Sequence, residues 1–356
     1  MILDISASKF RRVFEQKRFH LPMRWDGKDF LSTVDSLYTS YRRALRRAVG
    51  ENCQLADVLC EGIRRSIECY FEGSPSRAFS EFDEVMNTLM GYPLRTYQKS
   101  ARGDSLGYID PLKLFRVRNV QQNTLYRRTD IFHTPYNLRS KVATCRYSIA
   151  GYPSLYLGTS LALCGEESKA GSLTDFQIAS RFELVRDRNQ NPTQINVIEL
   201  AVKPQDFLPK NEDRDHIYEN RSGRRFDELD LNKNDIRVAY LLWYPLIAAC
   251  SFIRVSKADP FAAEYIIPQL LMQWVRHRFQ QEELYGIRYF SCASVKASEM
   301  GFNYVFPVSG KHYKKTQFCG VLAKSFRLTV PKYLHEYPSL EACERALIND
   351  TDINYI

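Results

Sequence analysis

Apolar side chains in the first quarter of the chain recur at steps of three and four residues, and this spacing restricts that region to amphipathic helices. One run extends over residues 31–49 and a second over residues 55–70. A Gly-Ser-Pro-Ser break at 73–76 precedes a third run around 79–90. Because a polar stretch at 91–107 then ends the pattern, we expect a helical N-terminal domain over residues 1–107.

Short apolar runs separated by turn residues dominate the next part of the chain. Strands are expected at 112–117, 154–157, 176–184, 195–201, 287–291, 304–307 and 326–330. Two longer apolar stretches, 238–253 and 262–279, are typical of helices, and Pro245 makes the first a buried helix or a helix pair. Interleaved strands and helices predict an α/β (α+β) fold. We expect a sheet domain at 108–332 and a C-terminal tail at 333–356.

The composition favours a globular protein that binds anions. The 356 residues exceed the size at which one core usually stops growing, about 250–300 residues, so two domains are expected. The net charge of +9 favours partners such as phosphates. The arginine pairs at 42–43 and 46–47 fit a solvated or partner-facing helix stripe. The N-terminal helices are also a candidate surface through which copies of the chain associate. Nucleic acid is not expected as a partner, because no nucleic-acid-binding motif accompanies these pairs.

Cysteine and histidine usage indicates a reducing compartment and no metal site. The nine cysteines are odd in number and include no CxxC pair, so we expect free thiols in a cytoplasmic protein. The six histidines show no HxxxH spacing, so no metal is expected. The first residues lack a signal-peptide pattern. Of the two longest uncharged stretches, 147–165 is interrupted by glycine and proline and 238–253 is short, so no membrane span is expected.

Five segments in the middle of the chain place arginines, a tyrosine, an acid and a serine in a fixed order. They are Phe115-Arg116-Val117-Arg118, Phe132–Tyr136 with Arg139, Cys145–Gly151, Leu155–Ser160 leading to Glu167, and Gly286–Ser291. In this order they resemble the RES-domain family, in its longer subgroup, over residues 110–332. The resemblance implies an ADP-ribosyltransferase-like fold that binds NAD and splits its nicotinamide–ribose bond. It also implies a toxin, usually neutralised by an antitoxin protein with a helix-turn-helix domain.

The resemblance also assigns the site residues. The family arginine, glutamate and serine correspond to Arg116, Glu167 and Ser291, which are the expected catalytic residues. The strand tyrosine corresponds to Tyr156 and the second arginine to Arg146. The expected NAD-binding residues are Arg116, Arg118, His133, Arg139, Arg146 and Tyr156. The chain departs from compact family members because over a hundred residues separate the glutamate from the serine, and because residues 1–107 lie outside the shared motif.

The chemistry of glycosidic cleavage suits these residue types. Breaking the bond develops positive charge on the ribose, which a fixed carboxylate such as Glu167 stabilises. Arginine donates paired hydrogen bonds to a diphosphate, so Arg116 and then Arg146 are the expected partners of that group. Tyr156 can lie against the nicotinamide or the ribose. Ser291 can bond the nicotinamide-ribose portion or hold Glu167 in place.

Several of these assignments have rivals in the sequence. Glu166 and Glu167 fit the start of a helix, where acids favour the dipole, and Glu166 is the alternative acid. Ser294 competes with Ser291, and Tyr156 also fits a core position.

We predict an NAD glycohydrolase or phosphorylase, with water or phosphate as the acceptor, that acts as a toxin or defence effector. One alternative is an ADP-ribosyltransferase that modifies a macromolecule. The other is a catalytically silent module that binds NAD or nucleic acid. No residue identifiable in the sequence must meet the adenosine 2′ position, so both NAD and NADP are candidate substrates.

Overall fold

A computed structural model of the chain describes residues 4–94, 113–120, 124–168, 176–185, 196–208, 233–256, 258–278, 285–308 and 317–356. The chain forms two compact units, each made of two separate stretches. Residues 1–106 and 202–270 form the first unit, and residues 107–201 and 271–356 form the second. These units differ from the predicted domains, because residues 202–270 belong with the N-terminal helices and the predicted tail at 333–356 belongs with the sheet.

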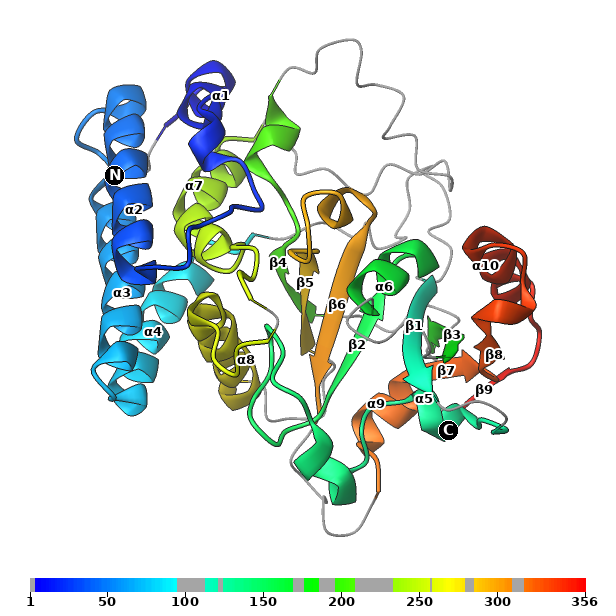
Figure 1. Cartoon of the computed structure of the whole chain (residues 1–356). Coiled ribbons are helices and arrows are strands. Elements are labelled where there is room, and N and C mark those ends of the chain that lie inside the picture. Colours follow the sequence, from blue (N-terminus) through cyan, green and yellow to red (C-terminus); the bar gives the residue numbers. More distant parts are fainter. Residues whose placement is uncertain are drawn as a thin grey trace. The chain divides into compact units, whose positions relative to one another are not determined.

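The first unit consists of helices that pack through their apolar faces (Figure 1). Its elements are α1 (Ala7–Phe14), η1 (Lys17–Phe19), α2 (Phe30–Val49), α3 (Gln54–Phe71), α4 (Pro75–Met90), η3 (Pro204–Phe207), α7 (Asn234–Ala249) and η5 (Ala263–Tyr265). The unit boundary at residue 270 falls within α8 (Ile266–Arg278). The three predicted N-terminal helices are confirmed. The third begins earlier than expected, at Pro75, because proline has a helical φ and no N–H to satisfy at the first helical position.

Helix α7 explains why residues 202–270 join the N-terminal helices. Its side chains from Ile236 to Ala249 are all buried, as expected for a helix that is apolar all round. It is one helix although Pro245 lies inside it, and proline leaves the carbonyl four residues earlier without its helical donor. That carbonyl, of Leu241, accepts a hydrogen bond of 2.6 Å from the Tyr41 hydroxyl on α2. The helical unit therefore needs both stretches of chain.

The second unit is built on one mixed sheet. Its strands are β1 (Lys113–Val120), β2 (Ser154–Gly158), β3 (Phe176–Leu184), β4 (Asn196–Leu200), β5 (Tyr285–Phe290), β6 (Phe302–Pro307), β7 (Phe326–Thr329), β8 (Lys332–Tyr333) and β9 (Ile353–Asn354). Their order is β4-β5-β6-β2-β1-β3-β7-β9, and β8 pairs with β3. The β4–β5 pair is parallel and the other pairs are antiparallel. The predicted α/β (α+β) class is confirmed.

Each face of this sheet has its own core. On one face Leu114, Leu155 and Phe182 pack with residues of α5 (Arg128–Ile131), η2 (Tyr136–Lys141) and α9 (Gly320–Ser325). On the other face Phe115 packs with residues of α6 (Leu161–Ser168) and α10 (Leu340–Ile348). Two single turns, η6 (Ala297–Glu299) and η7 (Leu334–Glu336), also belong to this unit. The second face carries α6 with Glu167, whereas Arg116 alternates with Phe115 along β1 and so starts from the first face.

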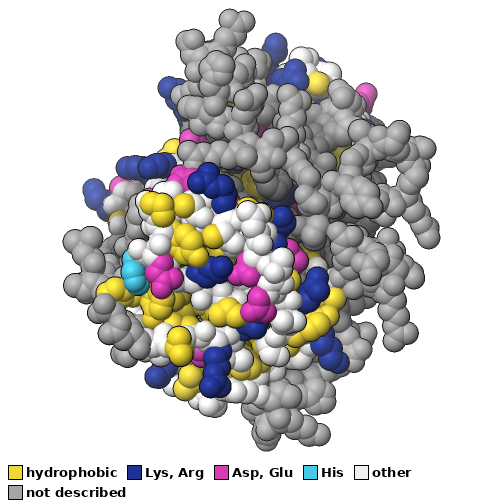
Figure 2. Space-filling view, turned by 90° about the vertical axis from the view of Figure 1, so that its right-hand side faces the viewer, with side chains coloured by type: hydrophobic (Ala, Val, Ile, Leu, Met, Phe, Trp, Pro, Cys, Tyr) yellow, Lys and Arg dark blue, Asp and Glu magenta, His cyan; other side chains and the backbone are white. Residues whose placement is uncertain are grey.

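Helix α10 was not predicted, since residues 333–356 were expected to be a tail. Ser339 caps its first turn by accepting from the Ala342 N–H at 3.2 Å. Cys343 and Leu347 then pack against Phe115. The helix is short, so its stability comes from this packing rather than from its own sequence. Figure 2 views the side that carries α10, β8 and β9, where hydrophobic, basic and acidic side chains are interspersed.

Among the helices that the structure describes, none combines the length and the apolar character needed to cross a bilayer. None of the nine cysteines, all of them in the described part of the chain, forms a disulfide, and seven of them are buried.

Candidate functional site

Strands β1 and β2 are neighbours in the sheet but pair over only a short part of their length (Figure 1). They pair at a single position, Phe115 opposite Gly158. By contrast β1 pairs with β3 along its whole length, and β2 pairs with β6 along its whole length. From Arg116 onward, the main chain of β1 therefore makes no ladder hydrogen bonds to β2.

Arg116 lies at the point where the pairing of β1 with β2 ends. Its side chain is half-buried, and its Nη1 donates to the Tyr156 carbonyl at 3.5 Å. Burial lowers the pKa of the Arg116 guanidinium to about 10, and the positive charge of Arg118 adds to this effect. A nearby anion would favour the charged form of the guanidinium and so oppose both influences.

Helix α6 follows β2 and carries Glu167. Its start is capped twice, since the Leu163 N–H donates to Ser160 Oγ at 3.2 Å and the Leu161 N–H donates to Glu344 Oε2 at 2.8 Å. The helix therefore begins at Leu161, and the prediction that the acids stand at a helix start is wrong: Glu166 and Glu167 lie in its last turn. The helix dipole disfavours a carboxylate at that end, so it needs other donors.

Two side chains supply those donors to Glu167. Ser291 Oγ donates to Glu167 Oε1 at 2.5 Å, and Asn303 Nδ2 donates to the same oxygen at 2.9 Å. Ser291 is fully buried just after β5, where its Oγ also accepts from the Ala293 N–H. Within the described residues, the other carboxylate oxygen of Glu167 has no hydrogen-bond partner. The structure therefore fixes the carboxylate and leaves one oxygen available.

Cys164 lies within electrostatic reach of both Glu167 and Arg116. Its thiol donates to the Phe115 carbonyl at 3.3 Å, and a Cβ at Gly158 would lie 2.7 Å from its sulfur. Glycine at position 158 thus allows α6 to approach β2. Burial raises the pKa of the Cys164 thiol to about 12, the Glu167 carboxylate raises it further, and the Arg116 charge opposes the shift. The thiol stays protonated at neutral pH and is no nucleophile.

Tyr156 and Arg146 lie on the same side as Glu167. The Tyr156 hydroxyl donates to the Tyr147 carbonyl, and the Tyr147 ring packs against Tyr289 with centroids 4.6 Å apart. Burial raises the pKa of Tyr289, the charge of Glu167 and the Tyr156 phenol raise it further, and the charge of Arg146 lowers it. The buried Tyr289 phenol therefore lies near Tyr147, Tyr156, Arg146 and Glu167. Because its hydroxyl is already bonded, Tyr156 has its ring to offer to a ligand.

The structure gives His133 a structural role. The Cys319 N–H donates to His133 Nε2 at 2.9 Å, which leaves the proton on Nδ1 to be donated to the Thr134 carbonyl at 2.8 Å. The ring is fully buried, and burial lowers the pKa of His133 to about 4. Both nitrogens are engaged, so His133 has none left for the ligand contact that the sequence suggested.

The remaining predicted residues are also engaged elsewhere. Arg118 is exposed, and its Nη1 donates to the Asp130 carbonyl at 2.5 Å. Arg139 Nε donates to the Tyr136 carbonyl at 3.3 Å within η2. Ser294, the rival of Ser291, accepts from the Ala297 N–H at the start of η6. None of these three has a described contact with Glu167.

Asn303 was missed by sequence reasoning. The predicted strand started one residue later, at Tyr304, although an asparagine inside the apolar run from Phe302 to Phe306 is a signal that a buried partner exists. The register places Asn303 opposite Tyr289 on β5 and opposite Gly158 on β2. Alternation then puts Ser291, two residues beyond Tyr289, on the same face as Asn303. The pairing of distant strands brings both donors to one carboxylate.

No group of three or more histidine, cysteine or acidic side chains in the described part of the chain could hold a metal ion.

The chain is similar to a protein whose name describes it as a putative toxin. It is 28% identical over 320 residues to a protein of Bacillus subtilis (strain 168) named "Putative toxin YopC". The match covers 86% of this chain and 66% of that protein's length. No family model matches the chain, and no solved structure matches it. The likeness to the RES-domain family therefore rests on the five ordered segments.

Proposed function

We propose that this protein is a toxin that cleaves the nicotinamide–ribose bond of NAD, with Glu167 as the carboxylate that acts on the ribose. The observation that carries the proposal is the state of Glu167: Ser291 and Asn303 hold one carboxylate oxygen, and the other is left without a partner among the described residues. A fixed acceptor of this kind suits charge that develops during a reaction. The printed name of the Bacillus subtilis relative supports the toxin part of the proposal.

The proposed reaction uses the carboxylate electrostatically. When the bond between ribose C1′ and the nicotinamide nitrogen breaks, its electron pair stays on the nitrogen, and nicotinamide leaves as a neutral molecule. The ribose ring gains oxocarbenium character, which the nearby Glu167 carboxylate stabilises. Water then forms a bond to C1′ and releases a proton, which gives ADP-ribose. Ser291 and Asn303 keep the carboxylate from rotating, and so its charge is preorganised.

Arg116 is the proposed partner of the diphosphate. Its guanidinium is desolvated and lies beside a second positive charge, which lowers its pKa, so an anion placed there gains more than it would at the surface. Arg146, which is buried near Tyr289, is the second candidate. The Tyr156 ring can lie against the nicotinamide-ribose portion and exclude water.

The test is nicotinamide release from NAD and NADP by the purified parent, Glu167→Gln and Glu166→Gln. The two variants change the charge equally at adjacent positions, so Glu166→Gln controls for net charge and helix stability. We expect release by the parent, a loss of about 100-fold or more in Glu167→Gln, and near-parental rates in Glu166→Gln. No release with water, phosphate or cell extract as acceptor would overturn the proposal. A selective loss in Glu166→Gln would reassign the carboxylate.

The products define the acceptor, and host cells test toxicity. Free ADP-ribose indicates water, its 1-phosphate indicates phosphate, and label retained on a macromolecule indicates ADP-ribosyl transfer. Induced expression of the parent should lower cellular NAD and arrest growth, and Glu167→Gln at equal expression should do neither. Growth arrest that persists in the variant would separate toxicity from NAD cleavage.

A further inference from the structure

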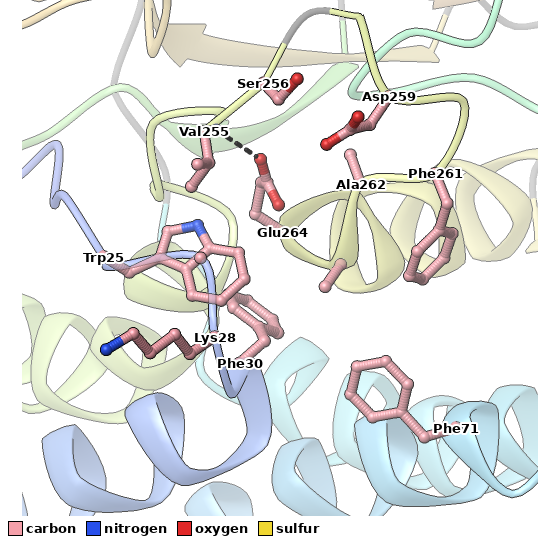
Figure 3. Close-up of a pocket in the computed structure, with 12 residues that line it drawn as sticks. Trp25, Lys28, Phe30, Phe71, Val255, Ser256, Asp259, Phe261, Ala262 and Glu264 are labelled. Atoms are coloured by element: carbon pink, nitrogen blue, oxygen red, sulfur yellow. Dashed lines mark hydrogen bonds between the residues drawn. The ribbon is translucent and has the colours of Figure 1, made fainter.

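A cavity of about 260 Å³ opens in the first unit, among residues that play no part in the proposed NAD chemistry (Figure 3). Its lining residues come from the turn before α2, the end of α3 and the loop before α8. They are Trp25, Gly27, Lys28, Phe30, Phe71, Val255, Ser256, Asp259, Phe261, Ala262, Ala263 and Glu264. Lys257 lies outside the described residues. The volume suits one side chain, because pockets for drug-sized ligands usually span about 300–1,000 Å³.

Aromatic rings form much of the wall. Trp25 and Phe30 meet edge to face with centroids 5.2 Å apart, and Phe71 and Phe261 meet at 6.5 Å. Phe71 is 47% exposed and Phe261 is 52% exposed, and these are large apolar side chains at the mouth of one cavity. Such a wall suits an apolar stem, and the ring faces attract a cation.

A buried carboxylate lies among these rings. Glu264 is 2% exposed, and one of its oxygens accepts from the Val255 N–H at 3.0 Å. Its other oxygen has no hydrogen-bond partner among the described residues. In Figure 3 the carboxylates of Glu264 and Asp259 lie on the same side of the cavity, above the ring of Trp25. A buried charge is costly without a counter-charge, so this one is set to receive a cation.

The described cations nearby, Lys28 and Arg254, form no ion pair with Glu264. Figure 3 shows the ammonium of Lys28 directed away from it. The Arg254 guanidinium donates to the carbonyls of Ser256 at 2.8 Å and Asp259 at 2.5 Å, and it lies over the Tyr265 ring. These bonds brace the loop before α8 rather than neutralise the acid. Among the described lining residues, Asp259 and Glu264 outnumber the one cation, Lys28, and this negative balance favours a positive ligand.

One donor of a lining residue also lacks a hydrogen-bond partner in the described part of the chain. Trp25 Nε1 is buried without a hydrogen bond in the described part of the chain. A buried N–H costs free energy until it meets an acceptor. A ligand that matches the cavity must therefore carry a cation, an apolar stem and a hydrogen-bond acceptor.

We propose that this cavity binds a lysine or arginine side chain presented by a polypeptide. The ammonium or guanidinium meets Glu264 with Asp259 at the rim, the methylene stem lies against the aromatic wall, and a peptide carbonyl accepts from Trp25 Nε1. This combination is found on a peptide-borne basic residue and is absent from a simple alkylamine. The assignment is independent of NAD cleavage.

The test uses three small probes on the full-length protein: N-acetyl-lysine methylamide, the uncharged N-acetyl-norleucine methylamide, and n-pentylamine, which lacks the carbonyls. Trp25 is half-exposed whereas Trp243 and Trp274 are buried, so binding in this cavity should change tryptophan fluorescence through Trp25. We expect the lysine probe to bind at least about 10-fold more tightly than either of the others.

Calorimetry with variants completes the test. Glu264→Gln, which keeps an acceptor for the Val255 N–H, should weaken binding of the lysine probe about 10-fold or more, and Glu84→Gln on the exposed face of α4 should not. Trp25→Phe should weaken binding of the lysine probe and leave binding of n-pentylamine unaffected.

Equal binding of the lysine and norleucine probes would overturn the proposal, and so would absence of lysine-probe binding to the parent. Both outcomes are read on the parent, so a variant that misfolds does not block the test. Pentylamine binding as tight as that of the lysine probe would overturn the polypeptide assignment.

Discussion

Glu167 and His133 show two uses of a polar side chain at the scale of the single residue. Both ring nitrogens of His133 form hydrogen bonds with the main chain, and these bonds hold the loop before η2. Glu167 has one oxygen bonded by two donors and the other without a described partner. Residue type alone does not distinguish a structural polar side chain from a candidate site residue. The number of donor or acceptor atoms left without a hydrogen bond does.

Asn303 is expected to matter through Glu167 and not through substrate. In Asn303→Ala the carboxylate keeps the Ser291 hydroxyl but loses the amide that limits its rotation. We expect kcat for nicotinamide release to fall about 10–100-fold, with KM for NAD little changed, as for outer partners that orient metal ligands. Asn354→Ala, at an exposed asparagine on β9, is the control. An unchanged kcat would show that Ser291 suffices to position Glu167.

His133 is expected to make the protein sensitive to acid. Its folded-state pKa of about 4 lies below the ordinary value of 6.5, because burial disfavours the cation. Between these pH values the unfolded chain binds a proton that the folded chain does not, so stability falls as the pH drops from 6.5 to 4 and then levels. The loss is on the order of 3 kcal/mol.

Urea unfolding at a series of pH values measures this loss. His133→Gln should be less stable than the parent at neutral pH, since it loses packing, but its stability should decline less steeply with acid. It should also leave KM for NAD unchanged, because His133 has no nitrogen free for a ligand. An equal decline in parent and variant would assign the acid sensitivity to other groups.

At the scale of the element, α6 and α7 are each completed by a side chain from elsewhere in the sequence. Glu344 on α10 caps the first N–H of α6, and Tyr41 on α2 supplies the donor that Pro245 removes from α7. Helix ends and proline positions leave main-chain groups unpaired, and their burial requires such partners. The partners tie each helix to a neighbour.

Tyr41 and Pro245 should therefore be energetically coupled. Tyr41→Phe leaves the buried Leu241 carbonyl without its donor, at a cost of about 1–3 kcal/mol. In a Pro245→Ala background the main-chain N–H restored at position 245 can reach that carbonyl, so the cost should be smaller by about 1 kcal/mol. Denaturant unfolding of the two single variants and the double variant gives the coupling.

Tyr38→Phe is the matched control for this cycle. The Tyr38 hydroxyl donates to the Pro245 carbonyl at 2.8 Å, and that bond does not depend on an N–H at position 245. The effect of Tyr38→Phe should then be the same in both backgrounds. Additive effects of Tyr41→Phe and Pro245→Ala would contradict the account of α7.

At the scale of the whole molecule, each compact unit is assembled from two stretches of chain. The helical unit draws α1–α4 from the N-terminal stretch and α7 from the second, and α7 is buried along its length. A chain cut near residue 107 separates α7 from the helices that cover it. The predicted N-terminal domain of residues 1–107 is therefore not a complete unit.

Fragments should show this division. Residues 1–107 expressed without the rest should lack a cooperative thermal transition, because the aromatic side chains that meet α7, such as Tyr41 and Phe14, lose their partners. Co-expression with residues 108–356 should restore a complex that elutes together on size exclusion. Circular dichroism and chromatography provide the measurements. A monomeric, cooperatively melting 1–107 fragment would refute the prediction.

The sequence by itself determined the local elements and the class of the fold. Helical spacing at 31–70 and short apolar runs such as 176–184 record which face of each element is buried, and that information lies within a few neighbouring residues. The ordered segments also brought Glu167 and Ser291 forward as site residues through a resemblance, and the structure joins them by a hydrogen bond.

The tertiary structure alone decided the rest. Helix α10 is stabilised by residues far apart from it in sequence. Helix α7 likewise packs against N-terminal helices that are about 200 residues away in the chain. Asn303 reaches Glu167 because the β5–β6 register sets it on the same face as Ser291. Register and burial are properties of paired elements, so no local pattern specifies them. For that reason the sequence supplied candidates for the site, and the fold shows which of them lie within hydrogen-bond reach of one another.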